Sequence, residues 1–95
     1  MGVVAEERPL DRKTVLVAVG QRVRSARAAK GISQEQLADL ANLHRTYVGA
    51  VERGERNPTV VSLYRLARAL TVRAADLLPD LGIAGQPGEA VILTK

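Results

Sequence analysis

The sequence predicts an all-α fold of five short helices, and three observations support this class. Apolar residues recur at three- and four-residue steps through most of the chain, which is the period of an amphipathic helix. Glycine, asparagine and proline residues interrupt this period at several points, as they do at helix ends. The chain has 95 residues and contains neither Phe nor Trp, so it is expected to form one small domain with an aliphatic core.

The first helix is expected from Thr14 to Lys30. Thr14 is the predicted N-cap, and Gly31 directly after Lys30 favours a left-handed stop. Gly20 lies inside this helix, where a glycine is compatible with a close contact to another element. The preceding residues mix charges with a proline and show no sustained period. Residues 1–13 are therefore predicted to be a mobile N-terminal arm.

Two short helices joined by a tight turn form the centre of the sequence. Ser33 and Gln36 have the S-x-x-Q spacing of a capping box at the start of the first of them. Asn42 interrupts the apolar pattern, and asparagine tolerates the left-handed conformation that a sharp turn requires. The second helix is expected to begin near Arg45 and to end at the glycine that follows Arg53.

A fourth helix is expected from Val60 to about Leu70, with Thr59 as its cap. Thr71 follows it, and threonine disfavours a positive φ, so this helix is expected to end without the usual left-handed residue. A short fifth helix is expected around residues 74–78. Its predicted cap is Arg73, a poor capping residue, so we expect its N-terminus to be weakly held.

The domain is therefore expected to span residues 14–79, followed by a C-terminal tail at residues 80–95. The tail begins with glycines and a proline, which indicate a linker or loop, and ends with a β-branched segment at residues 90–94. A single strand is not stable alone. Pairing with another chain, loose packing on the domain and disorder all remain open for this segment.

Several residues resemble the helix-turn-helix of the Cro/repressor-type (XRE-like) DNA-binding family. They are small Ala38, the turn at Asn42, apolar Val48 and Val51, and the ending VERGERNPT. The resemblance covers about Val19 to Leu78 and implies a five-helix, lambda-repressor-like DNA-binding domain. The phrase LHRTYVGAVERGERN is similar, more narrowly, to the controller proteins of restriction-modification systems. The implied function is a sequence-specific transcriptional regulator that binds a double-stranded DNA operator as a homodimer.

The resemblance places the recognition helix at about residues 45–53. The first residues of such a helix face base edges in the major groove. Arg45 can fork onto guanine O6 and N7, and Thr46 can reach a base edge or a thymine methyl group. Tyr47 is compatible with a sugar–phosphate contact and equally with packing in the domain. The expected base-reading residues are Arg45, Thr46, Tyr47 and Ala50.

Phosphate-binding positions follow from the resemblance at both ends of the motif. Ser33 and Gln34 lie at the start of the first motif helix, where free N–H groups favour an anion. Arg53, Arg56 and Asn57 follow the second motif helix. A solvated surface charge is the alternative for each arginine, but their clustering beside one helix end favours phosphate contacts.

Two structural expectations accompany this interpretation. Arg27 aligns with a position that in repressor-type domains often pairs with the acid of the E-R-G segment, here Glu52, so the resemblance implies an ion pair partly shielded from water. The fourth and fifth helices are expected to supply a two-fold interface. The candidates left after the core is filled are Leu70, Leu77 and Leu78.

Composition restricts the alternatives. Lys and Arg outnumber Asp and Glu by 14 to 10, for a net charge of +4, which suits a polyanion but also an ordinary basic protein. There is no Cys, and the one His, His44, lies in the turn, where capping or facing a phosphate is expected. We therefore expect no enzyme activity, no metal site and no cofactor.

The expected location is the cytoplasm, because the sequence shows neither an apolar run of membrane-spanning length nor a signal pattern. The competing hypothesis for function is an antitoxin or protein-interaction module on the same scaffold. In that case a protein partner is expected to order one tail, with residues 90–94 as the candidate segment.

Overall fold

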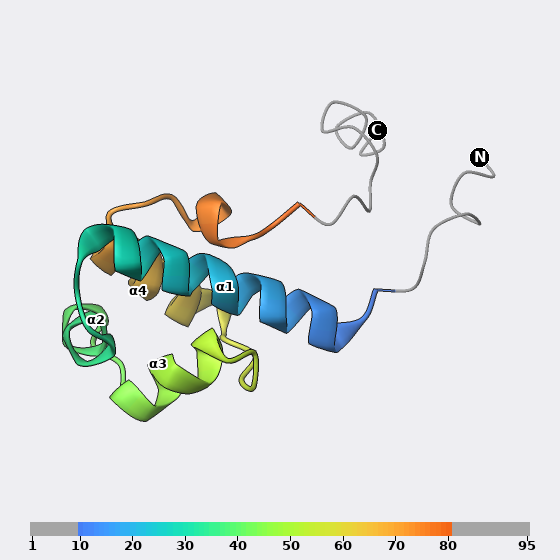
Figure 1. The fold of residues 1–95 in the computed structure, drawn as a ribbon, viewed down its shortest axis with the longest axis horizontal. Helices are drawn as coiled ribbons and strands as arrows, with labels where there is room; N and C mark the ends of the chain where they lie inside the picture. The colour runs from blue at the N-terminus through green and yellow to red at the C-terminus, as the bar shows by residue number, and fades with distance from the viewer. Residues whose placement is uncertain (1–9, 81–95) are drawn as a thin grey trace.

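A computed structural model describes residues 10–80, which form four α-helices and one 3-10 helix and contain no strand (Figure 1). The predicted all-α class is confirmed, whereas the count of five α-helices is wrong, because the last element is a single turn of 3-10 helix. Residues 1–9 of the expected arm and residues 81–95 of the expected tail lie outside the described residues. In chain order the elements are α1 (Arg12–Lys30), α2 (Gln34–Ala41), α3 (Arg45–Glu52), α4 (Val60–Leu70) and η2 (Ala74–Leu77).

The long helix α1 runs through the middle of the domain (Figure 1). α2 and α3 lie on one side of it and η2 on the other, and α1 contacts α3, α4 and η2. α4 also contacts α2 and η2, so it joins the two sides. None of the helices between residues 10 and 80 combines the length and apolar character needed to cross a membrane.

α1 begins two residues earlier than predicted, because Asp11 rather than Thr14 is its N-cap. The Asp11 carboxylate accepts hydrogen bonds from the Thr14 backbone N–H at 3.2 Å and from the Thr14 hydroxyl at 2.7 Å. Both bonds lower the pKa of the Asp11 carboxyl group below its ordinary value, and the bond from the Thr14 hydroxyl has the larger effect. Arg12 and Lys13 are therefore helical and do not belong to an arm.

The turn chemistry around α2 is as predicted. The Ser33 hydroxyl accepts from the Gln36 backbone N–H at 3.0 Å, and the Gln36 side-chain oxygen accepts from the Ser33 N–H at 2.8 Å. Asn42 ends the helix with a φ of 56°, in the left-handed region. His44 caps α3, since its Nδ1 accepts from the Thr46 N–H at 3.2 Å. The reciprocal cap and the left-handed asparagine together set the entry and exit of α2.

The end of α4 differs from the prediction. Thr71 adopts the left-handed conformation, with a φ of 60°, although threonine disfavours it. Its hydroxyl accepts a hydrogen bond from Lys30 Nζ at 3.1 Å, which links the ends of α1 and α4. At η2 the Arg73 side chain provides no cap, but the Asp76 carboxylate accepts from the Arg73 N–H at 3.0 Å and holds the first turn.

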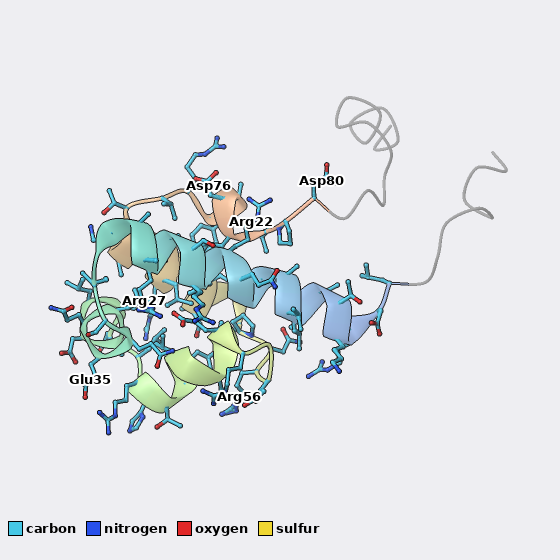
Figure 2. The ribbon with its side chains drawn as sticks, viewed as in Figure 1. Arg22, Arg27, Glu35, Arg56, Asp76 and Asp80 are labelled. Carbon is cyan, nitrogen blue, oxygen red and sulfur yellow. The ribbon has the colours of Figure 1, made fainter. Side chains whose placement is uncertain are left out.

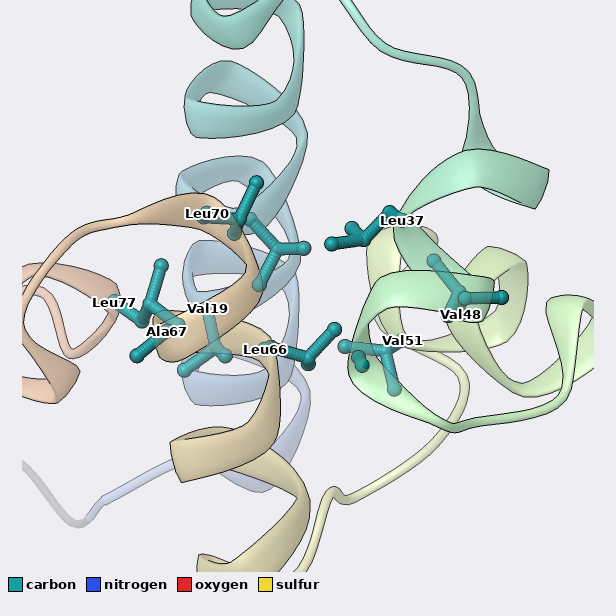
Figure 3. Packing of buried hydrophobic residues seen from close by; sticks show 11 residues of the cluster. Val19, Leu37, Val48, Val51, Leu66, Ala67, Leu70 and Leu77 are labelled. Carbon is teal, nitrogen blue, oxygen red and sulfur yellow. The ribbon is translucent and has the colours of Figure 1, made fainter.

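The core is aliphatic and lies between α1, the α2–α3 pair and α4 (Figure 3). Leu70 and Leu77 belong to it, with 4% and 1% of their surface exposed. They fill the space where η2 packs on α4, so the expectation that they form a dimer interface is wrong. Of the three leucines, Leu78 alone is exposed, at 51% of its surface.

Gly20 marks the close contact that its position suggested. A Cβ atom there would lie 2.4 Å from the carbonyl oxygen of Val51 and 2.5 Å from that of Glu52. These distances are too short for any side chain, so α1 packs directly on the backbone of the last turn of α3. This contact holds the second helix of the motif against the longest helix of the domain.

Candidate nucleic-acid interface

α3 has a buried side and an exposed side. Val48 and Val51 are 0% and 1% exposed and belong to the core. Arg45 and Thr46 are exposed in the first turn, while Tyr47 and Ala50 are half-buried. The N-terminal end of α3 therefore presents two of the predicted base-reading side chains, and both carry polar groups suited to that role.

A buried ion pair holds α3 at its C-terminal end. Arg27 Nε and Nη2 donate to the two Glu52 carboxylate oxygens at 2.6 Å and 3.0 Å, and the two side chains are 18% and 3% exposed. The pair predicted from the sequence is thus present, and Figure 2 shows Arg27 between α1 and the motif. The hydrogen bond with Glu52 raises the pKa of Arg27 above its ordinary value.

This ion pair extends to α2 and to the turn before it. Gln34 Nε2 donates to Glu52 Oε1 at 2.9 Å, and Arg27 Nη1 donates to the Ile32 carbonyl oxygen at 3.0 Å. A Cβ atom at Gly49 would lie 3.4 Å from Gln34 Oε1, an ordinary van der Waals contact, and 3.1 Å from Arg53 Nη1, so α2 and α3 are closely packed here. One carboxylate therefore joins α1, α2 and α3 and fixes the angle between the two motif helices.

The phosphate candidates are not equally free. Arg53, Arg56 and Asn57 are exposed after α3, and Arg53 Nε donates to Glu55 Oε1 at 3.1 Å. Ser33 is exposed, but its hydroxyl is used in the α2 cap, and half-buried Gln34 is used in the Glu52 network. The remaining candidates for phosphate contacts are the backbone N–H groups at the start of α2 and the side chains of Arg53, Arg56 and Asn57 after α3.

Two contacts at this surface were not predicted from the sequence. The Arg56 guanidinium carbon lies 5.5 Å from the centre of the Tyr47 ring, within the range of a cation–π contact. Arg45 Nη1 donates to Glu35 Oε2, from the start of α3 to the start of α2. Each contact joins residues nine or ten positions apart across a turn or loop, and no local spacing rule applies at that separation. In Figure 2, Glu35 and Arg56 lie on the outer side of the motif, away from α1.

A shallow hollow of about 440 Å³ lies where α2 meets α3. Its α2 wall carries the carboxylates of Glu35 and Asp39, and Arg45 and His44 lie on the opposite side. Among residues 10–80, no three side chains of the His, Cys, Asp or Glu type come together as metal ligands would. The full lining is Glu35, Ala38, Asp39, Leu43, His44 and Arg45.

Comparison with known proteins agrees with this arrangement. Residues 23–77 match a protein family described as helix-turn-helix. Control protein C.SmaI of Serratia marcescens is 44% identical over 79 residues, which cover 83% of this chain and 90% of that protein. Control protein C.BamHI of Bacillus amyloliquefaciens is 45% identical over 60 residues, which cover 62% of this chain and 74% of that protein.

Solved structures show the same fold. The restriction-modification controller protein C.AhdI from Aeromonas hydrophila has a TM-score of 0.65 at 52% identity, over 66% of this chain and 96% of that one. A hypothetical transcription factor from Neisseria has a TM-score of 0.67 at 34% identity, over 92% of this chain and 93% of that one. In this chain the motif is held by the Arg27–Glu52 pair, and the first turn of α3 is exposed. The chain belongs to the XRE-like helix-turn-helix family of sequence-specific DNA-binding transcriptional regulators.

Proposed function

We propose that this regulator binds a two-fold symmetric operator as a homodimer and controls the genes of a restriction-modification system. The exposed first turn of α3, with Arg45 and Thr46, is the observation that supports DNA reading through α3. Similarity to a restriction-modification controller protein at 52% identity supports the choice of genes. Each α3 would enter the major groove of one half-site.

The contacts divide into two groups. Arg45 and Thr46 read base edges, Tyr47 and Ala50 border this contact, and direct readout is concentrated at the N-terminal end of α3. Phosphates are bound after α3, where exposed arginines are available, and at the start of α2, where free N–H groups favour an anion. The phosphate-binding set is Ser33, Gln34, Arg53, Arg56 and Asn57.

The homodimer is assigned to the apolar face of α4, which we define as Val60, Val61 and Tyr64. These side chains are 68%, 59% and 58% exposed and adjoin one another at the start of the helix. Exposed apolar residues grouped in this way favour a protein contact. A second copy of the chain can bring the same face to it about a two-fold axis. This face takes the place of Leu70 and Leu77, which are buried.

Selection from a random pool of DNA duplexes tests the function. We expect the enriched sequence to contain two inverted half-sites whose centres lie about one helical turn apart, because a two-fold dimer presents its two recognition helices at that spacing. Enrichment of a single half-site would contradict the dimer. Enrichment of nothing would contradict DNA reading and favour the protein-interaction alternative.

Sedimentation of two variants tests the interface. Val61→Asp places a charge on the apolar face of α4, so we expect it to sediment as a monomer at micromolar concentration. Leu40→Asp is the matched control, because Leu40 lies on α2 and is also 59% exposed. The proposed face is wrong if both variants remain dimers, and the homodimer is wrong if the unaltered protein is a monomer both free and on DNA.

A further inference from the structure

We infer that Glu35 is a specificity-determining residue that acts through Arg45. It holds one nitrogen of the guanidinium group, leaves the remaining donors for guanine, and makes the same arginine a poor partner for phosphates. This inference rests on the proposed function, in which Arg45 reads bases.

The first support is stereochemical. Arg45 Nη1 donates to Glu35 Oε2, and within the described part of the chain this is the hydrogen bond that the guanidinium makes. A guanidinium has five N–H donors in a planar fork, so the edge formed by Nε and Nη2 remains free. Two N–H groups on one edge are what guanine O6 and N7 accept. A carboxylate bound at Nη1 restricts the rotation of the group and leaves this edge available.

The second support is the placement of charge. Glu35 and Asp39 lie one turn apart on α2, and both line the hollow beside Arg45. Their negative charges oppose the approach of a phosphate to the Arg45 guanidinium. The guanine O6 and N7 acceptors carry only partial negative charges, so they are opposed much less than a phosphate is. The carboxylates therefore penalise phosphate contacts of Arg45 more than guanine contacts, and a repulsive element of this kind increases specificity.

The third support is that the contact can be exchanged when DNA binds. The Arg45 and Glu35 side chains are 65% and 63% exposed. Exposed ion pairs contribute little to stability, so Arg45 can add guanine as a partner or adjust its position without disturbing the fold. Glu35 is therefore a positioning residue whose removal should change DNA discrimination and leave folding intact.

The chain contains a matched control for this effect. Arg53 Nε donates to Glu55 Oε1 at 3.1 Å, and these side chains are 57% and 61% exposed. This second pair has the same chemistry and exposure, but its arginine is assigned to the phosphates. Removing Glu55 should strengthen binding to every sequence alike, whereas removing Glu35 should reduce the preference for the operator.

The experiment measures the dissociation constants of the full chain and its variants on the selected operator and on a scrambled duplex, at one fixed salt concentration. For Glu35→Ala, the ratio of the scrambled to the operator constant should fall by about fivefold or more, the scale of one bidentate contact to guanine. Glu35→Gln keeps an acceptor but loses the charge, so its ratio should fall less. Glu55→Ala should leave the ratio unchanged, and thermal melts of all three should match the original protein.

A double variant tests whether Glu35 acts through Arg45. In an Arg45→Ala background, Glu35→Ala should no longer change the ratio, because the residue through which Glu35 acts is gone. An unchanged ratio in the single Glu35→Ala variant, or an equal fall with and without Arg45, would overturn the role of Glu35. If the original protein shows no preference for any duplex, the proposed function fails instead.

Discussion

Two ion pairs of the motif, each between an arginine and a glutamate, occupy opposite environments. Arg27–Glu52 lies between α1 and α3 with side chains 18% and 3% exposed, whereas Arg45–Glu35 lies at the N-terminal end of α3 with both partners nearly two-thirds exposed. In the buried pair, removal of one partner leaves a charge without compensation. In the exposed pair, water replaces the missing partner. Burial therefore decides which pair supports the fold and which remains available to a ligand.

The largest effect is expected from breaking the buried pair. Glu52→Ala leaves Gln34 without its acceptor and leaves Arg27 with the Ile32 carbonyl alone. The free energy of unfolding should fall by about 3 kcal/mol, the lower end for a buried pair because Arg27 is partly exposed. A thermal melt measures this, with Glu35→Ala as the control for the exposed pair. If Glu52→Ala and Glu35→Ala melted at the same temperature, the buried pair would stabilise the fold no more than the exposed pair does.

The next effect is expected from the exposed pair and concerns binding. Arg45→Ala should weaken operator binding by about 1–3 kcal/mol per protomer, because one guanine loses a bidentate partner. Stability should change by no more than about 0.5 kcal/mol, as is usual for a surface substitution. Fluorescence anisotropy on operator and scrambled duplexes measures the binding. If affinity drops equally on both duplexes, Arg45 binds phosphate and is not a reader of bases.

A third arginine sharpens the contrast between base and phosphate contacts. Arg56 lies over the ring of Tyr47 after α3, and Arg56→Ala should weaken binding to all sequences alike. The slope of log affinity against log salt should fall by about 0.9 for each phosphate that the variant no longer neutralises, which doubles in a dimer. A salt titration checks this. If Arg56→Ala left the slope unchanged but lowered the preference for the operator, Arg56 would contact bases and not phosphates.

The smallest effect is expected at a fully exposed carboxylate. Asp11→Ala removes the N-cap of α1, so amide exchange at Thr14 should accelerate while exchange in the α4 core stays unchanged. Because folding lowers the pKa of Asp11, its contribution is present above the ordinary carboxyl pKa and disappears as the pH falls through the lower folded value. NMR at neutral pH measures the exchange rates. If Thr14 exchanged equally fast in Asp11→Ala and in the unaltered protein, another group would hold the start of this helix.

Local features of the fold were predictable, because they depend on residues a few positions apart. The capping box of Ser33 and Gln36 and the left-handed Asn42 each follow from the chemistry of a short segment. Local predictions failed at the start of α1, at the end of α4 and at η2, whose first turn is held by the Asp76 carboxylate. Asp11 and Thr14 are both good caps, and the sequence does not show which one begins the helix. Thr71 takes the conformation it disfavours, in a turn where its hydroxyl also meets Lys30.

Long-range features were less predictable. Helical spacing shows that Leu70 and Leu77 are apolar positions, but only the packing of η2 on α4 shows that they are buried. The Arg27–Glu52 pair was found through family resemblance and not through spacing, since the two residues are 25 positions apart. The Arg45–Glu35 contact had neither signal. It arises from the angle between α2 and α3, which no local pattern specifies.

The placement of the aromatic residues makes the protein a simple spectroscopic system. The sequence has two tyrosines and neither Trp nor Phe. Tyr47 lies on α3 beneath Arg56, and Tyr64 lies on the apolar face of α4. Each emitter therefore samples one proposed surface, and no indole emission obscures either. A Tyr64→Leu variant would report DNA binding through Tyr47 alone, and a Tyr47→Leu variant would report self-association through Tyr64, without any attached dye.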